Sequence, residues 1–477
     1  DRVRSQAVAN TEALTLRAIP STFPSMEQLA DLLVRYEGKT LEFKRDLSSP
    51  ENILRTIVAF ANGAGGTLLI GVSDRTRYVG GIAEPTRTGE QLANLVSDRI
   101  EPRLVPEIQI LPWRRTYVIA VRVFPSSTRP HFMKDVGPEQ GVYVRVGSTN
   151  RRADPAQIEE IRRFVRGRGF DEEPLPEMDT EAIDFPAASE CFGSRRKLRK
   201  SDLKTLQLTT SHQNREVPTV AGILLFGRER LAEFPDARIR AGCFAGVDRS
   251  SILDSTDIDS YLPRAVEDVL HFIKRNTRRA VRVEGARNSE SWEFPLVAIR
   301  EAVVNAVVHA DYAQRGSPLR VAIFSDRIEI DNPGGLLPGL TLDEIRRGIS
   351  RLRNRVIGRV FHELGLIEQW GSGIPRMTTA CVQAGLPEPV FEEIGSSFRV
   401  TFLRQAAAEP RLDPLDRMIL EHVRQSGGAS TRQIASHIGR TPRAARTRLN
   451  RLVSLGLLAT VSSNPKDPRK IFRIAGS

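Results

Sequence analysis

Three polar residues recur at a spacing of four in an otherwise apolar stretch of the chain. Glu301, Asn305 and His309 are separated by Ala and Val. Residues four apart lie on one face of an α-helix, so the three side chains would form a single stripe. Buried polar groups cost free energy unless they are satisfied. A magnesium ion with a nucleoside triphosphate would satisfy them; the alternative is an amphipathic helix with a solvated polar stripe.

Two glycine-containing turns follow this stretch. Asp331 ends a predicted strand and precedes Asn-Pro-Gly334-Gly335, and Gly371 and Gly373 precede a predicted helix. An Asp at a strand end can accept a hydrogen bond from the amino group of adenine, while glycines let the backbone approach the base. Backbone amides at a glycine turn and a helix N-terminus suit phosphate. Either glycine pair alone is also what a tight turn requires. The prediction therefore rests on the order of the polar helix, the Asp-plus-Gly turn and the Gly-x-Gly turn along the chain.

A second group of acidic residues lies near the N-terminus. Glu42 and Lys44 share one face of a predicted strand, and Glu37 lies five residues before Glu42. Asp74 follows a predicted buried strand. Three converging carboxylates, with Glu42 and Asp74 as metal ligands, could hold a divalent cation against a phosphodiester. The alternative is a half-exposed strand with ordinary salt bridges. The candidates for phosphate contacts are Lys44, Arg145, Arg151 and Arg152.

Apolar periodicity predicts the elements that would carry these residues. In the N-terminal part, strands are predicted at 40–44, 67–72, 117–124 and 141–146, and helices at 52–61, 91–100 and 155–166. In the middle part, strands are predicted at 219–226, 238–244 and twice within 319–330, and helices at 261–276 and around Glu301. The fold class expected from these elements is α/β with several domains.

The C-terminal part carries most of the charge imbalance. Residues 411–477 contain 13 Lys and Arg against 4 Asp and Glu, a net charge of +9, and the whole chain is +12. Helices are predicted at 414–424, 431–438 and 442–455, and strands at 457–461 and 471–474. Such a basic module is typical of a polyanion-binding domain. The candidates for nucleic-acid contacts are Arg443, Arg446 and Asn450 on the third helix, and Lys466, Arg469 and Lys470 between the strands.

Length and composition bound the class of protein. A chain of 477 residues is too long for one core, so about three domains are expected. No apolar run approaches the roughly 20 residues that span a bilayer, and the three cysteines are far apart, so we expect a cytoplasmic protein without membrane contacts. The expected division is a leader at 1–25, a first domain at 26–170, a linker at 171–190, a second domain at 191–405 and the basic domain at 411–477.

The first domain resembles the Schlafen AlbA-2 family. The resemblance rests on residues 37–44, 60–74 and 142–150. It implies nucleic-acid binding, and some Schlafen members are metal-dependent RNA nucleases that use two Glu and one Asp. Glu37, Glu42 and Asp74 match that pattern in this chain.

Residues 190–405 resemble the divergent GHKL-type ATPase module of bacterial proteins described as divergent AAA-4 or RecG C-terminal-like. The resemblance rests on residues 218–227, 300–312, 331–336, 353–354 and 371–373. It implies a Bergerat-like α/β sandwich with an ATP site. In that site Glu301 would activate water, Asn305 would bind magnesium, Asp331 would contact adenine, and Gly371 and Gly373 would line the phosphates.

This chain departs from the ATPase family in three ways. Ala310 stands where the family usually has Arg, the first glycine turn is Asp-Asn-Pro-Gly-Gly, and no large lid is evident between Gly335 and Gly371. ATP binding, with weak hydrolysis at most, is therefore expected rather than fast turnover.

The C-terminal domain resembles a winged helix-turn-helix, whose third helix would enter a DNA major groove. The expected function is a regulator or defence protein of the transcription-regulator type, in which ATP state modulates DNA or RNA binding. Analogy with GHKL relatives and paired half-sites suggests a homodimer. Two alternatives stay open: an ATP-gated, metal-dependent nuclease, and a protein-interaction scaffold with an inactive nucleotide site.

Overall fold

The computed structural model describes residues 26–193, 195–277, 279–284, 287–367, 372–404, 412–454, 457–461 and 470–474. The chain separates into two compact units, 1–403 and 404–477. Within the described ranges, no helix has the length and apolar character needed to cross a membrane. The fold is mixed α/β, as expected from the sequence.

A four-stranded sheet forms the N-terminal module, in the order β1-β2-β5-β4. Only β1 and β2 pair in parallel; β2, β5 and β4 pair antiparallel. Alternating residues of β2 face two cores, because Leu68 packs with helices α2 and α3 whereas Leu69 packs with Leu29 of α1. The elements are α1 (Met26–Val34), β1 (Leu41–Lys44), α2 (Pro50–Asn62), β2 (Gly66–Ile70), α3 (Pro85–Arg99), β3 (Ile100–Glu101), β4 (Glu107–Trp113), β5 (Thr116–Val123), β6 (Phe132–Met133), β7 (Tyr143–Val146), β8 (Thr149–Arg152) and α4 (Pro155–Val165).

The predicted N-terminal elements are present with shifted ends. Helix α3 begins at Pro85 and not at residue 91, since proline is favoured in the first helical turn. Helix α4 begins as predicted, with Asp154 accepting from the backbone amide of Gln157 at 2.8 Å.

The segment 171–190, predicted to be a linker, is packed into the structure. Asp171 is fully buried, and its Oδ2 accepts from the amides of Val356 and Ile357 at 2.7 and 3.0 Å. Its apolar residues join the core of the second sheet. The elements here are η1 (Phe170–Glu172), η2 (Thr180–Ala182) and α5 (Phe185–Phe192). The Pro and acidic residues that suggested a linker therefore cap and connect short helices.

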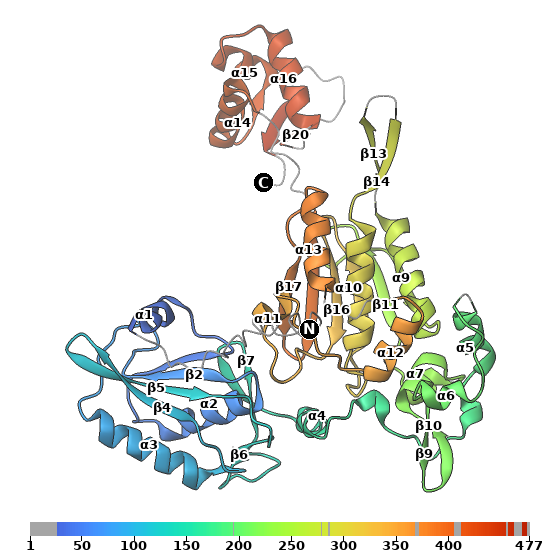
Figure 1. Cartoon of the computed structure of the whole chain (residues 1–477). Helices are drawn as coiled ribbons and strands as arrows, with labels where there is room; N and C mark the ends of the chain where they lie inside the picture. Colours follow the sequence, from blue (N-terminus) through green and yellow to red (C-terminus); the bar gives the residue numbers. More distant parts are fainter. Residues whose placement is uncertain are drawn as a thin grey trace, which may run out of the picture. The chain divides into compact units, whose positions relative to one another are not determined.

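A six-stranded sheet carries the middle part of the chain, in the order β12-β11-β15-β16-β18-β17. Strands β11 and β15 are parallel and the other pairs are antiparallel. Helices α9, α10 and α13 lie over one face (Figure 1), and their apolar residues form one large core with that face. The principal elements are β11 (Ile239–Phe244), β12 (Ile252–Ile258), α9 (Leu262–Asn276), α10 (Leu296–His309), β15 (Leu319–Ile323), β16 (Arg327–Pro333), α11 (Leu342–Arg346), α12 (Arg355–Glu363), α13 (Gly373–Gln383), β17 (Val390–Ile394) and β18 (Ser397–Leu403).

The prediction of a strand at 219–226 is wrong, because Val220–Phe226 forms helix α7. Thr219 caps this helix by accepting from the amide of Gly222 at 3.1 Å. All seven helical residues are buried, and a short apolar run buried on every side has no periodicity that separates helix from strand. The remaining elements are α6 (Asp202–Thr205), β9 (Thr209–His212), β10 (Arg215–Pro218), α8 (Arg230–Glu233), β13 (Arg279–Glu284) and β14 (Arg287–Trp292).

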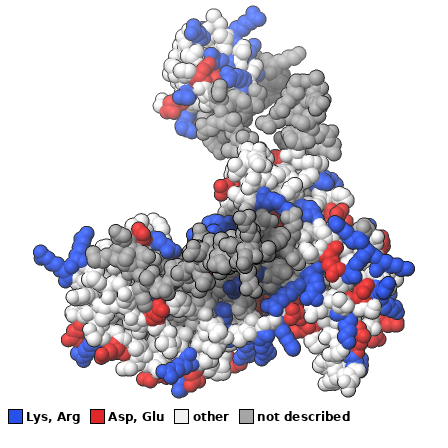
Figure 2. All heavy atoms as spheres, in the orientation of Figure 1, with Lys and Arg blue, Asp and Glu red and all other residues white. Residues whose placement is uncertain are grey.

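The C-terminal unit is a three-helix winged fold, as predicted. Its helices are α14 (Pro414–Ser426), α15 (Thr431–His437) and α16 (Pro442–Ser454), and its sheet has the order β19 (Ala429–Ser430), β21 (Ile471–Ile474), β20 (Leu458–Val461). The core includes Ile419, Val423, Ala445, Leu449, Leu452 and Phe472. Figure 2 shows several Lys and Arg side chains on the visible face of this unit.

Candidate nucleotide and nucleic-acid sites

One cavity of about 530 Å³ collects most of the residues predicted to bind a nucleotide. The stripe on α10 forms part of its wall, because Glu301, Asn305 and His309 all line it. The alanines and valines on the other faces of α10 are buried in the core, which fixes the rotation of the helix. The other predicted residues that line the cavity are Gly334, Gly335 and Gly373.

Glu301 is held in place from two sides. Its carboxylate contacts the guanidinium of Arg376 on α13, and it accepts from the Nδ2 of Asn305 at 3.3 Å. Gly373 lies directly against it, because a Cβ added at that position would be 2.2 Å from Glu301 Oε1. Only glycine fits there without moving the carboxylate, so α10 and α13 approach closely at this point.

His309 is an uncharged member of the stripe. Burial, with a smaller contribution from the nearby Arg353 guanidinium, lowers the pKa of His309 to about 4. Its imidazole is therefore neutral near pH 7 and can form hydrogen bonds without adding positive charge to the cavity.

Asp331 lies on the opposite side of the sheet from the cavity, which corrects its assignment as the adenine contact. It pairs with Arg399, whose Nε and Nη2 donate to the two carboxylate oxygens at 2.5 and 2.9 Å. Successive residues of a strand point to opposite faces, so the next residue, Asn332, faces the helices and lines the cavity. The candidate for the polar contact to the base is therefore displaced by one residue.

The turn after β16 is built around Arg353 and Gly334. Arg353 donates to the carbonyls of His309 and Gly335 at 2.7 and 2.9 Å, so it joins the end of α10 to the turn. Gly334 has φ +93°, and a Cβ on it would lie 2.2 Å from Arg353 Nη1. Asn354 adds bonds to the carbonyls of Val308 and Ala310 at 2.9 and 2.7 Å. These contacts fix the cavity wall.

Much of the cavity wall comes from the segment 336–362, in which no lid was expected. Its apolar part suits a flat, weakly polar group such as a nucleobase. Its basic part suits phosphate oxygens. The apolar residues include Leu336, Leu337, Leu340, Ile345 and Ile349, and the basic ones are Arg351, Arg353, Arg355 and Arg359. The abundance of Leu and Arg in this segment is the sequence signal for such a wall.

The donor set beside α10 fits a magnesium ion. Glu301 and Asn305 supply a carboxylate and an amide oxygen, and Mg²⁺ prefers oxygen ligands and is usually held by one or two side chains together with phosphate and water. In this structure Nδ2 of Asn305 faces Glu301, so the amide would have to rotate for its oxygen to share a metal with that carboxylate. A metal held by these two residues would supply positive charge that neutralises nearby phosphate.

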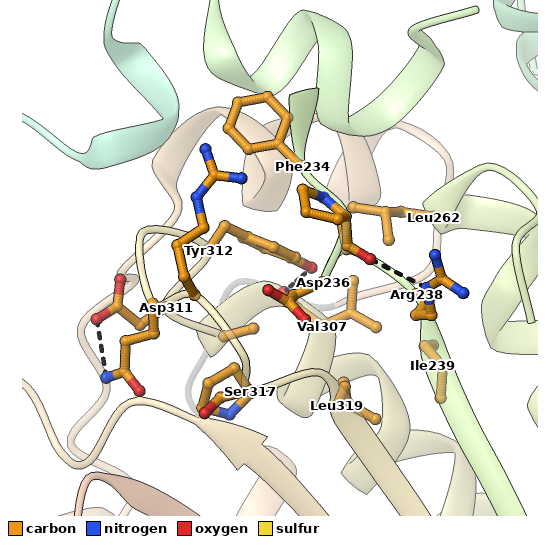
Figure 3. A pocket seen from close by; sticks show the side chains of 16 residues that line it. Phe234, Asp236, Arg238, Ile239, Leu262, Val307, Asp311, Tyr312, Ser317 and Leu319 are labelled. Carbon is orange, nitrogen blue, oxygen red and sulfur yellow. Dashed lines mark hydrogen bonds between the residues drawn. The ribbon is translucent and has the colours of Figure 1, made fainter. Parts of the chain in front are cut away.

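A second cavity, drawn in Figure 3, is too small for a ligand. It has about 10 Å³ of free space, which is at the lower limit for one water molecule. Tyr312 lies in it and donates its hydroxyl to the carbonyl of Val307 at 2.9 Å. This region closes the C-terminal end of α10 and serves to hold that helix in position.

The three N-terminal carboxylates are not gathered into a metal site, which corrects the sequence prediction. Glu42 contacts Lys44 and Arg145. Glu37 accepts from the amide of Phe43 at 2.8 Å, and burial raises its pKa. Asp74 is exposed in a loop. Among the described residues, no three His, Cys, Asp or Glu side chains are placed to hold a metal ion together. The alternation along β1 is as predicted, and the ion pair of Glu42 with Lys44 matches the alternative of ordinary salt bridges; the sequence pattern did not indicate Arg145 as a further partner.

The basic candidates of the N-terminal module differ in exposure. The side chain of Arg145 is buried and donates to Gly38, Asn150 and Glu42, so it holds the module together rather than facing a ligand. Arg151 and Arg152 are exposed on β8. Lys44 is half-buried beside Glu42.

On the C-terminal unit, the predicted outward face of α16 is exposed. Arg443, Arg446 and Asn450 all point away from the core, whereas Arg448 pairs with Asp413 and Asp416 at 2.6 and 2.8 Å. Lys470 is half-buried, with its Nζ 5.9 Å from the ring centre of Phe472. The candidates Gly371, Lys466 and Arg469, and the leader 1–25, lie outside the described residues.

Family comparisons match three separate segments of the chain. Residues 37–154 match the family described as Schlafen, AlbA_2, and residues 412–459 match winged helix-turn-helix DNA-binding. Residues 316–402 match the family described as putative ATP-dependent DNA helicase recG C-terminal. The chain thus joins three segments that are each similar to one of these families. Helix α10, which carries Glu301 and Asn305, lies before the matched RecG-like segment.

One solved structure is similar to most of this chain, and another is similar to a part of it. The crystal structure of the DIP2311 protein from Corynebacterium diphtheriae is 19% identical, covers 94% of this chain and 96% of its own, and has a TM-score of 0.42. The solution structure of the N-terminal domain of a putative ATP-dependent DNA helicase RecG-related protein from Nitrosomonas europaea is 26% identical. It covers 28% of this chain and 94% of its own, with a TM-score of 0.23.

Proposed function

We propose that this protein binds ATP with Mg²⁺ in the 530 Å³ cavity and that nucleotide occupancy changes how tightly the chain binds nucleic acid. The ATPase-like family segment supports a nucleotide, and the winged-helix and Schlafen segments support nucleic acid. The separate cysteines support a reducing, cytoplasmic setting.

Different residues around the cavity bind the base, the phosphates and the metal. The apolar wall and Asn332 receive the base, and Arg351, Arg355 and Arg359 face the phosphates. Asn305 and Glu301 hold the metal that accompanies the triphosphate. Because Glu301 is already paired with Arg376, we expect binding with slow hydrolysis rather than fast turnover.

The proposed effect of nucleotide on nucleic-acid binding is supported by contacts between the turn that lines the cavity and the N-terminal module. Glu393 accepts from the amide of Leu336 at 2.8 Å and from Lys39 at 2.8 and 2.7 Å. Next to Lys39, the carbonyl of Gly38 accepts from Arg145 at 3.0 Å. A ligand that moves the turn therefore acts on β1 and its surroundings.

A second connection runs through helix α4. Arg353, which donates to the turn, also pairs with Glu160 at 2.7 Å. Ligands can influence each other only if they favour different arrangements of a shared element, and this turn is such an element. Two ion pairs on either side of it give the coupling a physical path.

The C-terminal unit provides the proposed duplex-binding end. The exposed basic face of α16 is suited to a major groove, and paired half-sites would require a homodimer. Light scattering on the purified chain measures that oligomeric state.

The test is a binding cycle on the full chain. Affinity for ATP with Mg²⁺ is measured by calorimetry with and without a saturating DNA duplex or single-stranded RNA. We expect the two ligands to change each other's affinity by the same factor, about five-fold or more. Asn305→Ala should abolish the nucleotide effect, whereas Asn94→Ala, an exposed position on α3, should not. Equal nucleic-acid affinity at zero and saturating ATP rejects the proposal.

A further inference from the structure

Two aromatic side chains of the N-terminal module are almost fully exposed. Tyr36 and Tyr78 are 82% and 73% exposed. Tyr36 follows the end of α1, and Tyr78 lies in the loop between β2 and α3. Side chains this exposed contribute little to folding through burial, so much of each ring is available to another molecule.

Arg77 joins the two segments that carry these tyrosines. Its guanidinium lies 4.2 Å from the centre of the Tyr36 ring, and its Nη1 donates to the carbonyl of Val34 at 2.9 Å. Arg77 has φ +56°, a backbone region that residues other than glycine seldom adopt. Arg77 therefore fixes the end of α1 and this loop side by side, contacting the Tyr36 ring and directly preceding Tyr78 in the chain.

The loop itself is closed by backbone bonds. The amide of Ser73 donates to the carbonyl of Tyr78 at 2.9 Å, and the amide of Arg77 donates to the carbonyl of Ser73 at 2.9 Å. Val72 and Val79 form a bridge at its base. Tyr78 is thus presented from a short, well-fixed loop, which lowers the entropy lost when a ligand stacks on it.

Charged residues surround the two rings. Arg35 and Arg75 are exposed beside Tyr36 and Tyr78. The nearby acids are Asp74, which accepts from the amide of Arg75 at 2.9 Å, and Glu37, which accepts from the amide of Phe43. Both carboxylates are engaged by backbone amides, whereas the arginine side chains extend outward.

We propose that Tyr36, Arg77 and Tyr78 form a stacking surface for the unpaired bases of a single-stranded nucleic acid. The inference rests on the proposed function and specifies its ligand in the N-terminal module. Aromatic rings and guanidinium planes stack on bases of any sequence, and only unpaired bases expose their faces. Arg35 and Arg75 would contact the flanking phosphates. A duplex offers no such faces and would be left to the C-terminal unit.

The experiment compares strands with and without bases. Fluorescence anisotropy measures binding of the full chain to three labelled strands of 15 nucleotides and equal charge: oligo(dT), oligo(rU) and an abasic strand. We expect the wild type to bind the base-containing strands at least about ten-fold more tightly than the abasic ones, in line with one stacked base or more. The difference between oligo(dT) and oligo(rU) reports whether DNA or RNA is preferred.

Variants assign that difference to the two rings. Tyr36→Ala and Tyr78→Ala should each weaken binding of the base-containing strand several-fold and leave abasic binding unchanged. Tyr36→Phe should retain the wild-type affinity, since the ring remains. Tyr117→Ala is the matched control, because Tyr117 is an exposed tyrosine on β5 of the same module. Circular dichroism confirms that the variants fold.

Two outcomes overturn the inference. Equal wild-type affinity for abasic and base-containing strands excludes stacking, even if nucleic-acid binding and its dependence on ATP are intact. Tyr36→Ala and Tyr78→Ala variants that match Tyr117→Ala exclude these residues. If the wild type binds none of the strands and no duplex, both this inference and the proposed function fail.

Discussion

Lys39 forms an ion pair with Glu393 in which its Nζ lies 2.8 and 2.7 Å from the two carboxylate oxygens. The residues are 354 positions apart in the chain. Glu393 also accepts from Leu336, at the cavity, so one carboxylate connects the proposed nucleotide site with the N-terminal module. Both side chains are about one-fifth exposed, which limits screening by solvent.

Removing this ion pair should uncouple the two ligands. In Lys39→Met, ATP and nucleic acid should each still bind, but the factor by which one changes the affinity of the other should fall toward one. Lys39→Arg should keep most of it, because a guanidinium can still pair with Glu393 while that carboxylate keeps its bond from Leu336. Lys134→Met, which removes an exposed ion pair with Glu101, is the control. Full coupling in Lys39→Met would contradict the path.

Arg376 should be needed for nucleotide affinity. Without it, Glu301 becomes a largely buried, uncompensated carboxylate beside the proposed phosphates, at a cost of about 1–3 kcal/mol. Arg376→Met should therefore weaken ATP binding about ten-fold or more, as measured by calorimetry. Arg320→Met, an exposed strand position, should have no effect. Arg376→Lys, which keeps a positive charge beside Glu301, should retain most of the affinity; a loss as large as in Arg376→Met would assign another role to Arg376.

Gly373→Ala should disrupt the site with little change in global stability. The added Cβ would be 2.2 Å from Glu301 Oε1, so the carboxylate or α13 must move. We expect ATP affinity to fall at least ten-fold. Gly246→Ala is the control, because nothing lies within 4 Å of a Cβ built there. Unchanged affinity in Gly373→Ala would mean that Glu301 does not need this position.

Stability should decrease as pH rises toward neutrality because of Asp171. Burial raises the pKa of Asp171 to about 7, above its ordinary value of 3.8. The folded state therefore holds the proton more tightly, and the stabilisation present below pH 4 is lost as pH approaches 7. The integrated effect is on the order of 4 kcal/mol. In urea unfolding, Asp171→Asn should lose this pH dependence, whereas Asp74→Asn should retain it.

The substitutions Arg443→Gln and Arg446→Gln should each weaken binding of a DNA duplex. Each variant should reduce the slope of log affinity against log salt by about one, since each phosphate contact releases counterions. Arg448→Gln should instead lower the melting temperature, because Arg448 pairs with Asp413 and with the buried Asp416. An unchanged salt slope in both exposed-face variants would place the duplex elsewhere.

Local patterns in the sequence predicted the placement of side chains where one element decides the position. The spacing of Glu301, Asn305 and His309 gave the correct helix face because the intervening Ala and Val residues could only be core. The capped helix α4 and the winged fold were equally local predictions.

Positions that depend on distant partners were not predictable in this way. Asp331 pairs with Arg399, 68 residues later, and the face of β16 that meets α10 is decided by packing. Glu42 is engaged by Arg145, 103 residues later, so the expected carboxylate group did not form. In both cases the residue type indicated which ligands the side chain could bind, but an arginine far along the chain pairs with it instead.

The burial of Asp171 has a consequence for dividing this protein into pieces. Its carboxylate supplies the acceptor for two amides in the first turn of α12, 185 and 186 residues further on. A fragment that begins after residue 190 would leave those amides without that acceptor and open the core where Phe170 and Leu175 pack. A stable fragment that contains the cavity should therefore begin before Gly169, whatever boundary the family comparisons suggest.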